Sequence, residues 1–271
     1  MKSLKLLSIF ALLGTLLSAK TLVFGVVPQQ SPLKLVNDWQ PLINRIQNET
    51  GEKVVLKIER SIPEFERNLY GGKYDIAYMN PYHYVIAHQK QGYIAKVRDS
   101  KKLTGILIVR NDSGFTDVSM LKGKKFLFPA PDAFAATLLA KYELLKRYGI
   151  NIEQEKKFQY VNSHDSVYKG IARGIGDVGG GIERTFDNFS DTEAKSALKI
   201  IYRTQSYPSH PFAFKSSMPA KEQAKITKVL LALPQEMLDS LNMKQIIVTN
   251  DAEYDDVRDI VSVLSTASGK E

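Results

Sequence analysis

The sequence predicts an α/β protein built of two lobes with a ligand cleft between them. Short apolar runs typical of buried strands alternate with longer segments whose apolar residues have helical spacing. The alternation occurs twice, over residues 21–92 and again, after LTGILIVRND (103–112), over residues 124–182, and it is typical of parallel sheets covered by helices. Extended and then helical segments follow, so we expect the chain to return to the first lobe.

The first run begins with a strong strand–helix pair. The helix expected after the first strand places five apolar residues on one face, namely Leu35, Trp39, Leu42, Ile43 and Ile46. It ends at Gly51, a residue that favours helix C-termini, and Pro81 suits the first turn of a later helix. The predicted elements are a strand at 21–28, a helix at 33–51, a strand at 53–59, a helix at 62–72, a strand at 74–79 and a helix at 81–92.

The second run predicts another lobe. It begins after the stretch LTGILIVRND (103–112), and its expected elements are a strand at 124–131, a helix after Asp132, a strand at 157–163, a helix at 164–174 and a strand at 177–182. Extended segments at 198–208 and 211–217 come next, and helices are expected at 220–241 and 255–268. The predicted domains are therefore a leader of residues 1–19, a first lobe of residues 20–105 and 213–271, and a second lobe of residues 106–212.

The leader has the pattern of a secretory signal peptide. Lys2 and Lys5 precede an apolar run, and Ser18-Ala19 suits a cleavage site. A single membrane anchor is the alternative, but the run of about a dozen apolar residues is shorter than the roughly 20 that span a bilayer. We expect export to the periplasm with cleavage. The sequence has no cysteine, which excludes disulfides and a lipid anchor on an N-terminal cysteine.

The charge of the chain is a scattered positive excess. The formal net charge is +8, and removal of Lys2 and Lys5 leaves 35 basic and 29 acidic residues, or +6. Basic residues form no runs and do not interleave with aromatic residues, so no nucleic-acid partner is expected. The excess is compatible with long-range attraction of anions.

Short motifs for catalysis or metal binding are missing from the sequence. It lacks GxSxG, SxxK, GxxxxGK[ST] and a GxGxxG that precedes a helix. The four histidines have neither HxH nor HxxxH spacing. We therefore expect no catalytic residue, metal or cofactor. A metal site built from three histidines and a carboxylate is the alternative.

Two similar loops follow strands of the two lobes. NLYGGKYDIAYMNP (68–81) and IARGIGDVGGGIER (171–184) each end a helix in glycine and open a strand with an aspartate. In parallel sheets the loops after the carboxyl ends of strands carry the ligand site. Loops 78–82 and 179–184 are therefore expected to face each other across the cleft. The glycines of VGGGIE indicate close backbone approach to a ligand or to a neighbouring segment.

The helix after Asp132 is a candidate anion site. Asp132 is a good N-cap, and free backbone N–H groups at a helix N-terminus bind anions readily. The side chains at this place are Ala133-Phe134-Ala135-Ala136, none of which has a hydroxyl. Backbone amides alone would therefore hold an anion here.

Further candidates lie where other strands end. Ser163 is expected to cap the next helix and leave the His164 imidazole free beside its N-terminus. Two prolines keep the segment TQSYPSHP extended and rigid, which presents its tyrosine and histidine. The expected ligand-binding residues are Gln29, Tyr78, Asn80, Tyr82, Phe134, Ala135, Ala136, His164, Glu183, Tyr207 and His210.

With these segments in order, the chain resembles the periplasmic solute-binding proteins of phosphate/phosphite/phosphonate ABC transporters. The resemblance covers nearly all of the chain after the leader. It implies the type II periplasmic-binding-protein fold, in which two α/β lobes joined by a hinge of crossing strands close on a ligand. The segments that carry it are VFGVVPQQSPLKLVNDWQPLINRIQNETG, GGKYDIAYMNPYHYVIA, FPAPDAFAATLLAKYELLKRYGI, VNSHDSVYKGIARGIGDVGGG and RTQSYPSHPFAF.

The resemblance implies the site residues only in part. Family members hold the oxyanion with a Ser/Thr tripeptide at the helix N-terminus, where this chain has residues 133–136 without a hydroxyl. His164 matches a family histidine and Glu183 an acidic residue, whereas Ile62 and Leu103 replace two family aromatics. We therefore expect a different small anion, or a larger and less charged ligand, in a pocket shaped by the phenylalanine.

Three functions follow from this pattern. The first is capture of a small anion by a monomeric binding protein for the permease of an ABC transporter. The second is a periplasmic sensor that presents its ligand to a membrane receptor kinase. The third is an exported enzyme, for which Ser163 or Ser166 beside His164 is the nearest nucleophile–base pair, too close in sequence to be persuasive.

Overall fold

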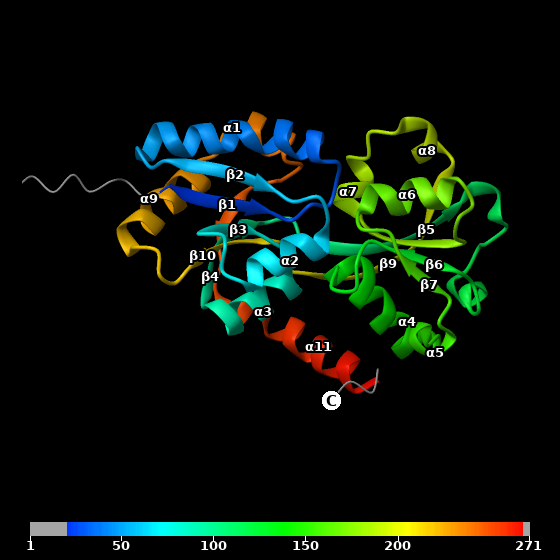
Figure 1. The fold of residues 1–271 in the computed structure, drawn as a ribbon. Coiled ribbons are helices and arrows are strands. Elements are labelled where there is room, and N and C mark those ends of the chain that lie inside the picture. The colour runs from blue at the N-terminus through cyan, green and yellow to red at the C-terminus, as the bar shows by residue number, and fades with distance from the viewer. Residues whose placement is uncertain (1–20, 268–271) are drawn as a thin grey trace, which may run out of the picture.

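The computed structural model describes residues 21–267 and contains two β-sheets, each covered by helices (Figure 1). One sheet has six strands and the other has five. The two sheets lie side by side along an elongated molecule, and α11 lies beneath them (Figure 1). The predicted α/β class with two lobes is confirmed. The predicted leader, residues 1–19, lies outside the described residues.

The first sheet has the strand order β11-β4-β10-β3-β1-β2. Its strands are β1 (Leu22–Val26), β2 (Val54–Ile58), β3 (Ile76–Tyr78), β4 (Tyr93–Asp99), β10 (Pro211–Lys215) and β11 (Ile246–Val248). β1 pairs in parallel with β2 and β3, and β10 pairs antiparallel with β3 and β4. Because β10 follows the whole second sheet in sequence, the chain returns to the first lobe as predicted.

Helices cover both faces of this sheet. The five apolar residues predicted on one face of α1 are all buried, and α1 ends at Gly51 with a left-handed φ of 74°. α1 lies above the sheet, and α2 and α3 lie below it (Figure 1). The helical segments are α1 (Pro32–Thr50), α2 (Ile62–Tyr70), α3 (Pro81–Gln91), α9 (Ala220–Leu231), α10 (Gln235–Ser240), η4 (Asp251–Tyr254) and α11 (Asp255–Ala267).

The second sheet has the strand order β7-β6-β8-β5-β9. β6 pairs in parallel with β7 and β8, and β5 pairs antiparallel with β8 and β9. Its strands are β5 (Leu103–Arg110), β6 (Phe126–Phe128), β7 (Phe158–Tyr160), β8 (Val178–Ile182) and β9 (Leu198–Tyr207). Its helical segments are η1 (Asn111–Ser113), η2 (Val118–Leu121), η3 (Phe134–Leu139), α4 (Ala140–Tyr148), α5 (Ile152–Glu155), α6 (His164–Ala172), α7 (Glu183–Asp187) and α8 (Thr192–Ser196).

Three features differ from the prediction. Both sheets are mixed rather than parallel, because the strands next to each crossing run antiparallel to their neighbours. The prediction omits β4 and β11, although β4 alternates buried and half-buried residues. The single helix predicted at 220–241 is two helices, because Pro234 has no N–H to continue the helical bonding of α9.

The chain crosses between the sheets twice. β4 ends at Asp99 in the first sheet and β5 begins at Leu103 in the second. β9 ends at Tyr207 in the second sheet and β10 begins at Pro211 in the first. The expected lobe limits at 105/106 and 212/213 thus fall inside β5 and β10. Each strand belongs to the lobe of its sheet.

The two lobes share an apolar core across the cleft. The largest cluster of buried side chains contains Phe24, Trp39 and Phe212 of the first lobe together with Phe134 and Leu139 of the second. Two further clusters lie within the second lobe. The start of η3 is therefore packed against the first lobe, and the lobes are closed on each other.

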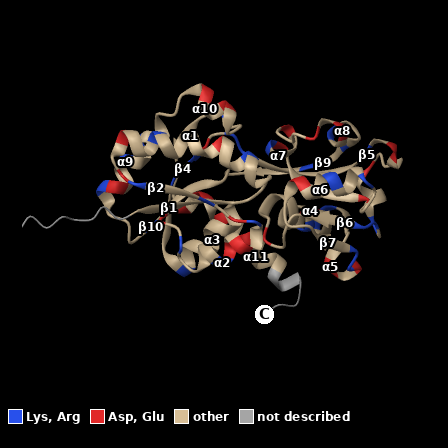
Figure 2. Ribbon diagram, turned by 45° about the horizontal axis from the view of Figure 1, so that its top comes forward, with Lys and Arg blue, Asp and Glu red and all other residues tan. Residues whose placement is uncertain are grey.

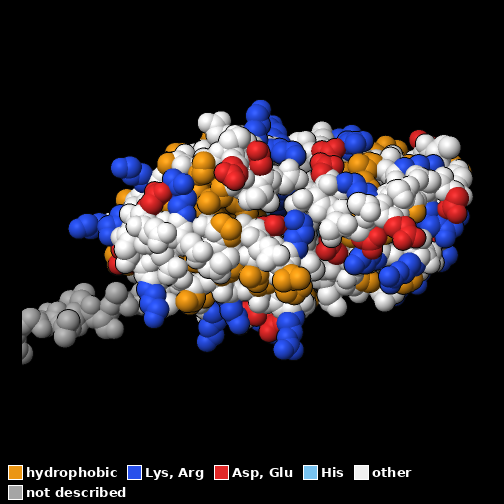
Figure 3. Space-filling view, turned by 90° about the horizontal axis from the view of Figure 1, so that it is seen from above, with side chains coloured by type: hydrophobic (Ala, Val, Ile, Leu, Met, Phe, Trp, Pro, Cys, Tyr) orange, Lys and Arg blue, Asp and Glu red, His pale blue; other side chains and the backbone are white. Residues whose placement is uncertain are grey.

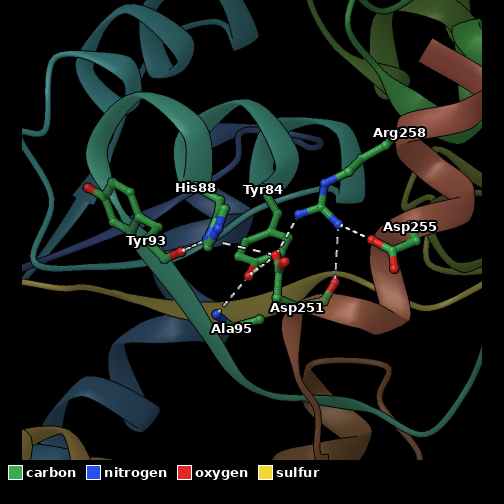
Figure 4. Close-up of polar contacts among 7 residues, drawn as sticks. All are labelled: Tyr84, His88, Tyr93, Ala95, Asp251, Asp255 and Arg258. Carbon is green, nitrogen blue, oxygen red and sulfur yellow. Dashed lines mark hydrogen bonds and ion pairs between the residues drawn. The ribbon is translucent and has the colours of Figure 1, made fainter. Parts of the chain in front are cut away.

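A polar network fixes the start of the C-terminal helix to the first lobe (Figure 4). The Tyr84 hydroxyl donates to Oδ1 of Asp251 over 2.8 Å, and Nη2 of Arg258 donates to the same oxygen over 2.6 Å. Nη1 of Arg258 donates to Oδ1 of Asp255 over 2.6 Å. α11 also contacts η3 of the second lobe. The network therefore orients a helix that touches both lobes.

Charged side chains are distributed over both lobes (Figure 2). In Figure 3 lysines and arginines are interspersed with acidic side chains on the face shown. Within residues 21–267, no helix combines the length and the apolar character needed to cross a membrane.

Candidate functional site

A cavity lies between the lobes, at the ends of strands from both sheets. It encloses about 250 Å³, counting the part open to solvent. Four polar residues line it, namely Gln29, Asn80, His164 and His210. Its apolar lining residues are Val27, Ile62, Leu103, Ala133, Phe134, Ala135, Ala136 and Ile182. The structure thus brings seven of the eleven expected ligand-binding residues to one place.

The N-terminus of η3 contributes backbone amides to this cavity. Its first turn is π-helical, because the N–H of Leu138 donates to the carbonyl of Ala133. The N–H groups of residues 134–136 precede the first intrahelical bond and have no acceptor within the helix. Thr137 does not restore the missing hydroxyls, because its Oγ1 donates to the carbonyl of Ala130 over 2.7 Å.

Two strand glycines allow η3 to lie this close to the second sheet. A Cβ on Gly180 would be 2.0 Å from the carbonyl oxygen of Ala136, and a Cβ on Gly105 would be 2.4 Å from that of Ala135. Both oxygens belong to the backbone, so neither can move aside alone. The glycines of β8 therefore accommodate a neighbouring chain segment, which is one of the two roles that the sequence left open.

His164 is the first residue of α6 and is 1% exposed. Ser163 caps this helix by accepting from the N–H of Ser166 over 3.1 Å. Across the cleft, the N–H of His164 donates to the carbonyl of Gln29 over 3.2 Å. Burial, together with the charge of Arg184, lowers the pKa of His164 to about 3, so the ring is neutral near neutral pH. Its Nδ1 is buried without a hydrogen-bond partner.

Arg184 of α7 reaches across the cleft to the first lobe. Its Nη2 donates to Oε1 of Gln29 over 2.8 Å, and its Nη1 donates to the hydroxyl of Tyr78. Nε2 of Gln29 lies 3.0 Å from Nε2 of His210. The Tyr78 ring stacks on the His210 ring with 5.3 Å between centroids. Burial, assisted by Arg184, His83 and His164, holds the pKa of His210 well below its usual value.

Asn80 is the N-cap of α3 and also lines the cavity. Its Oδ1 accepts from the N–H of His83 over 2.8 Å, and its Nδ2 donates to the carbonyl of Asp132 over 3.0 Å. The His83 ring is fully buried, and its Nε2 lies 2.9 Å from Oε1 of Glu66. Helix capping and contact between the lobes are thus combined in one side chain.

Four expected ligand-binding residues lie outside the lining of this cavity. Tyr78 lies behind His210, on which it stacks, and Tyr82 is half-buried in the first turn of α3. Tyr207 packs edge-to-face on Phe134 with 5.6 Å between centroids, so it supports the wall of the cavity rather than forming it.

Glu183, the fourth, is not among the residues that line the cavity. Nε of Arg203 donates to its Oε1 over 2.6 Å. Arg184, the next residue, is the one that makes the contacts across the cleft. The sequence signal for it was the loop at 179–184, which identifies the correct wall. The loop gave no basis for choosing between two adjacent charged residues, of which Glu183 pairs with Arg203 and Arg184 bonds to Gln29.

A second cavity lies on the other side of the Gln29–Arg184 contact and encloses about 390 Å³, counting the part open to solvent. It shares Val27 and Gln29 with the first cavity, and Trp39 and Tyr78 form part of its wall. Among the residues that the structure describes, no group of three or more His, Cys, Asp or Glu side chains is arranged to hold a metal ion.

The family model for the periplasmic substrate-binding proteins of phosphonate ABC transporters matches residues 24–254. The chain belongs to this family. The match includes every residue that lines the first cavity. As a member of the phosphonate-binding family, the chain is a substrate-binding component of an ABC transporter, and the predicted class of function is confirmed.

Solved structures support the fold of this phosphonate-binding family member. PhnD1 from Prochlorococcus marinus in complex with methylphosphonate has a TM-score of 0.83 at 16% identity, over 93% of this chain and 100% of that one. A binding protein component of an ABC phosphonate transporter from Pseudomonas aeruginosa has a TM-score of 0.81 at 15% identity, over 89% and 85%. A histidine kinase sensor domain has a TM-score of 0.57 at 14% identity, over 89% and 95%.

Proposed function

We propose that this protein captures a small oxyanion in the cavity between its lobes and delivers it to the permease of its transporter. The observation that supports this proposal is that the backbone amides at the start of η3 and two buried histidines, whose pKa values burial lowers, border one cavity between the lobes. Amides at a helix N-terminus favour negative charge through the dipole of the helix. The complex of PhnD1 with methylphosphonate supports an oxyanion as the class of ligand.

We further propose that the ligand carries a single negative charge and an apolar group. Eight of the twelve lining residues are apolar, and the expected serine or threonine hydroxyls are absent from residues 133–136. Each such hydroxyl bond to a charged ligand contributes about 1.5–3 kcal/mol, so a doubly charged ligand would be poorly compensated. Phe134 and Ile182 offer an apolar wall to the uncharged part of the ligand.

A thermal-shift screen tests this proposal. The protein is heated with phosphate, phosphite, methylphosphonate, longer alkylphosphonates, sulfonates and carboxylates in turn. Ligand at 100 times its Kd stabilises the folded state by about 2.7 kcal/mol. Ala135→Leu, which fills the cavity, should abolish the shift, whereas Ala220→Leu on the surface of α9 should retain it. A panel in which no oxyanion raises the melting temperature would contradict the proposal.

We also propose that the protein is monomeric and is exported with cleavage after Ala19. Light scattering and N-terminal sequencing of the periplasmic protein test these points.

Capture for a sensor kinase is the second candidate, and the fold similarity to a histidine kinase sensor domain favours it. Deletion of the gene separates the two functions, because loss of uptake of the identified ligand supports transport and loss of a transcriptional response alone supports sensing.

A further inference from the structure

Three side chains form a relay of contacts beside the first cavity. Arg184 of the second lobe donates to one terminal atom of the Gln29 amide over 2.8 Å, and the other terminal atom lies 3.0 Å from Nε2 of His210. A guanidinium has only donors, so the atom of Gln29 that faces it must be the carbonyl oxygen. The atom that faces His210 is therefore the NH2 group.

This amide orientation determines the tautomer of His210. An amide NH2 group donates and does not accept, so Nε2 of His210 must be the acceptor. A neutral imidazole with an accepting Nε2 carries its proton on Nδ1. Nδ1 of His210 is buried and has no hydrogen-bond partner, and the ring lines the cavity. The Nδ1–H group is thus a donor whose partner is not supplied by the protein.

We infer that Arg184 is a positioning residue for ligand recognition, which acts through Gln29 to hold His210 as an Nδ1–H donor toward an acceptor oxygen of the ligand. For the ligand, the inference rests on the proposed function. For the tautomer, it rests only on the contacts between Arg184, Gln29 and His210.

Arg184 is itself held in a defined position. Its Nη1 donates to the Tyr78 hydroxyl, and the guanidinium carbon lies 5.5 Å from the centroid of the Tyr78 ring. The carbonyl of Arg184 accepts from Nδ2 of Asn242 over 3.1 Å, which adds a contact from the first lobe. The neighbouring Glu183 pairs with Arg203 rather than with Arg184. The guanidinium is thus directed at the Gln29 amide.

The charge of Arg184 also favours an anion over a cation in the cavity. It lowers the pKa of both His164 and His210, so its field extends to the two polar rings of the lining. A ligand with negative charge and acceptor oxygens matches both effects of this arginine, the electrostatic field and the oriented donor. A cationic ligand, or one that has only donors at this position, matches neither.

Long-range 1H–15N NMR of protein labelled with 15N-histidine tests the relay, because it distinguishes a protonated Nδ1 from a protonated Nε2. In the wild type, His210 should be predominantly the Nδ1–H form. Arg184→Met should populate the Nε2–H form, since the freed amide can turn its oxygen to His210. Gln29→Glu should reverse the tautomer, because a carboxylate accepts from both Arg184 and His210. Arg203→Met, which removes an exposed arginine of the same lobe, should leave His210 unchanged.

The second test measures the affinity for methylphosphonate by calorimetry. Arg184→Met should weaken binding about tenfold or more, the effect of losing one oriented donor to a charged acceptor. A predominant Nε2–H form in the wild type, or tautomer populations that Arg184→Met and Gln29→Glu both leave unchanged, would overturn the inference. Expected tautomers without methylphosphonate binding would instead support the relay and count against methylphosphonate as the oxyanion of the proposed function.

Discussion

Nδ2 of Asn80 donates to the carbonyl oxygen of Asp132 over 3.0 Å, and this bond joins the N-cap of α3 in the first lobe to the segment before η3 in the second. The same side chain accepts from the N–H of His83. One asparagine therefore starts a helix and holds the lobes together at the cavity.

We predict that Asn80→Ala lowers the free energy of unfolding by about 2 kcal/mol, because a cap and a bond between the lobes are lost together. Asn151→Ala is the matched control, since Asn151 caps α5 through the N–H of Gln154 and makes the cap alone. Its expected cost is about 1 kcal/mol. Urea unfolding followed by the fluorescence of Trp39, the single tryptophan, measures both. Equal losses for the two variants would show that the contact with Asp132 contributes nothing.

Gly180 is predicted to tolerate no larger residue. Gly180→Ala places a methyl group 2.0 Å from the Ala136 carbonyl oxygen and 2.6 Å from the Phe128 ring, so β8 and η3 must separate. The expected loss is about 3 kcal/mol or more, in the upper range for overpacking. Gly114→Ala meets no atom within 4 Å and is strained only by its φ of +72°, which costs about 1–2 kcal/mol. Thermal unfolding that ranks the two variants equally would contradict this account.

Stability is predicted to fall as the pH falls below about 6.5. The folded state keeps His164 neutral with a pKa of about 3, whereas an unfolded histidine has a pKa of about 6.5. Between these two pKa values the unfolded chain binds more protons than the folded protein, so acid lowers the free energy of unfolding. The contribution of neutral His164 to stability is therefore fully present above the unfolded pKa and is lost as the pH falls toward the folded pKa. Each such group contributes a slope of up to about 1.4 kcal/mol per pH unit.

His164→Gln should therefore flatten the dependence of unfolding free energy on pH between about 6.5 and 4. Ser163→Ala serves as the control in the same helix. It removes the cap on the N–H of Ser166 and should cost about 1 kcal/mol at every pH without a change in slope. Urea unfolding at a series of pH values gives both quantities. A slope that survives His164→Gln unchanged would assign the acid sensitivity elsewhere.

A hydroxyl restored at the start of η3 is predicted to improve binding of a phosphonate. Ala135→Ser adds a donor next to the free amides of residues 134–136, and one bond to a charged oxygen corresponds to about tenfold in affinity. Ala220→Ser makes the same chemical change on the surface of α9 and should have no effect. Calorimetry with methylphosphonate compares them. Tight binding by the wild type together with no gain from Ala135→Ser would contradict the role given to the missing hydroxyls.

The network of Figure 4 is predicted to control the order of α11 rather than the global stability. Arg258→Met removes the donors to Asp251 and Asp255. Because these ion pairs are partly exposed, the global cost should stay below about 1 kcal/mol. Hydrogen exchange should nevertheless accelerate in α11 and at the start of η3, which it contacts. Arg45→Met, which removes a similarly exposed pair with Glu49 in α1 and a bond to the carbonyl of Ala232, is the control.

Local sequence patterns predict much of the fold. The face of α1 follows from helical spacing, and Pro81 and Ser163 mark helix starts because a first-turn proline or a cap needs only neighbours in the chain. β4 was missed although its burial alternates, since it follows α3 after a single glycine and lies next to a crossing. The mixed sheets were missed because strand direction depends on where the chain crosses between lobes, which no local pattern specifies.

For the site, the sequence by itself identified the loops that meet in the cleft, the hydroxyl-free start of η3 and the two histidines of the cavity lining. The tertiary structure alone decided that Arg184, not Glu183, crosses the cleft to Gln29, and that Gln29 meets His210. These partners are 155 and 181 residues apart in the chain. Periodicity and capping act over a few residues, whereas such contacts exist only after two sheets have formed and closed on each other.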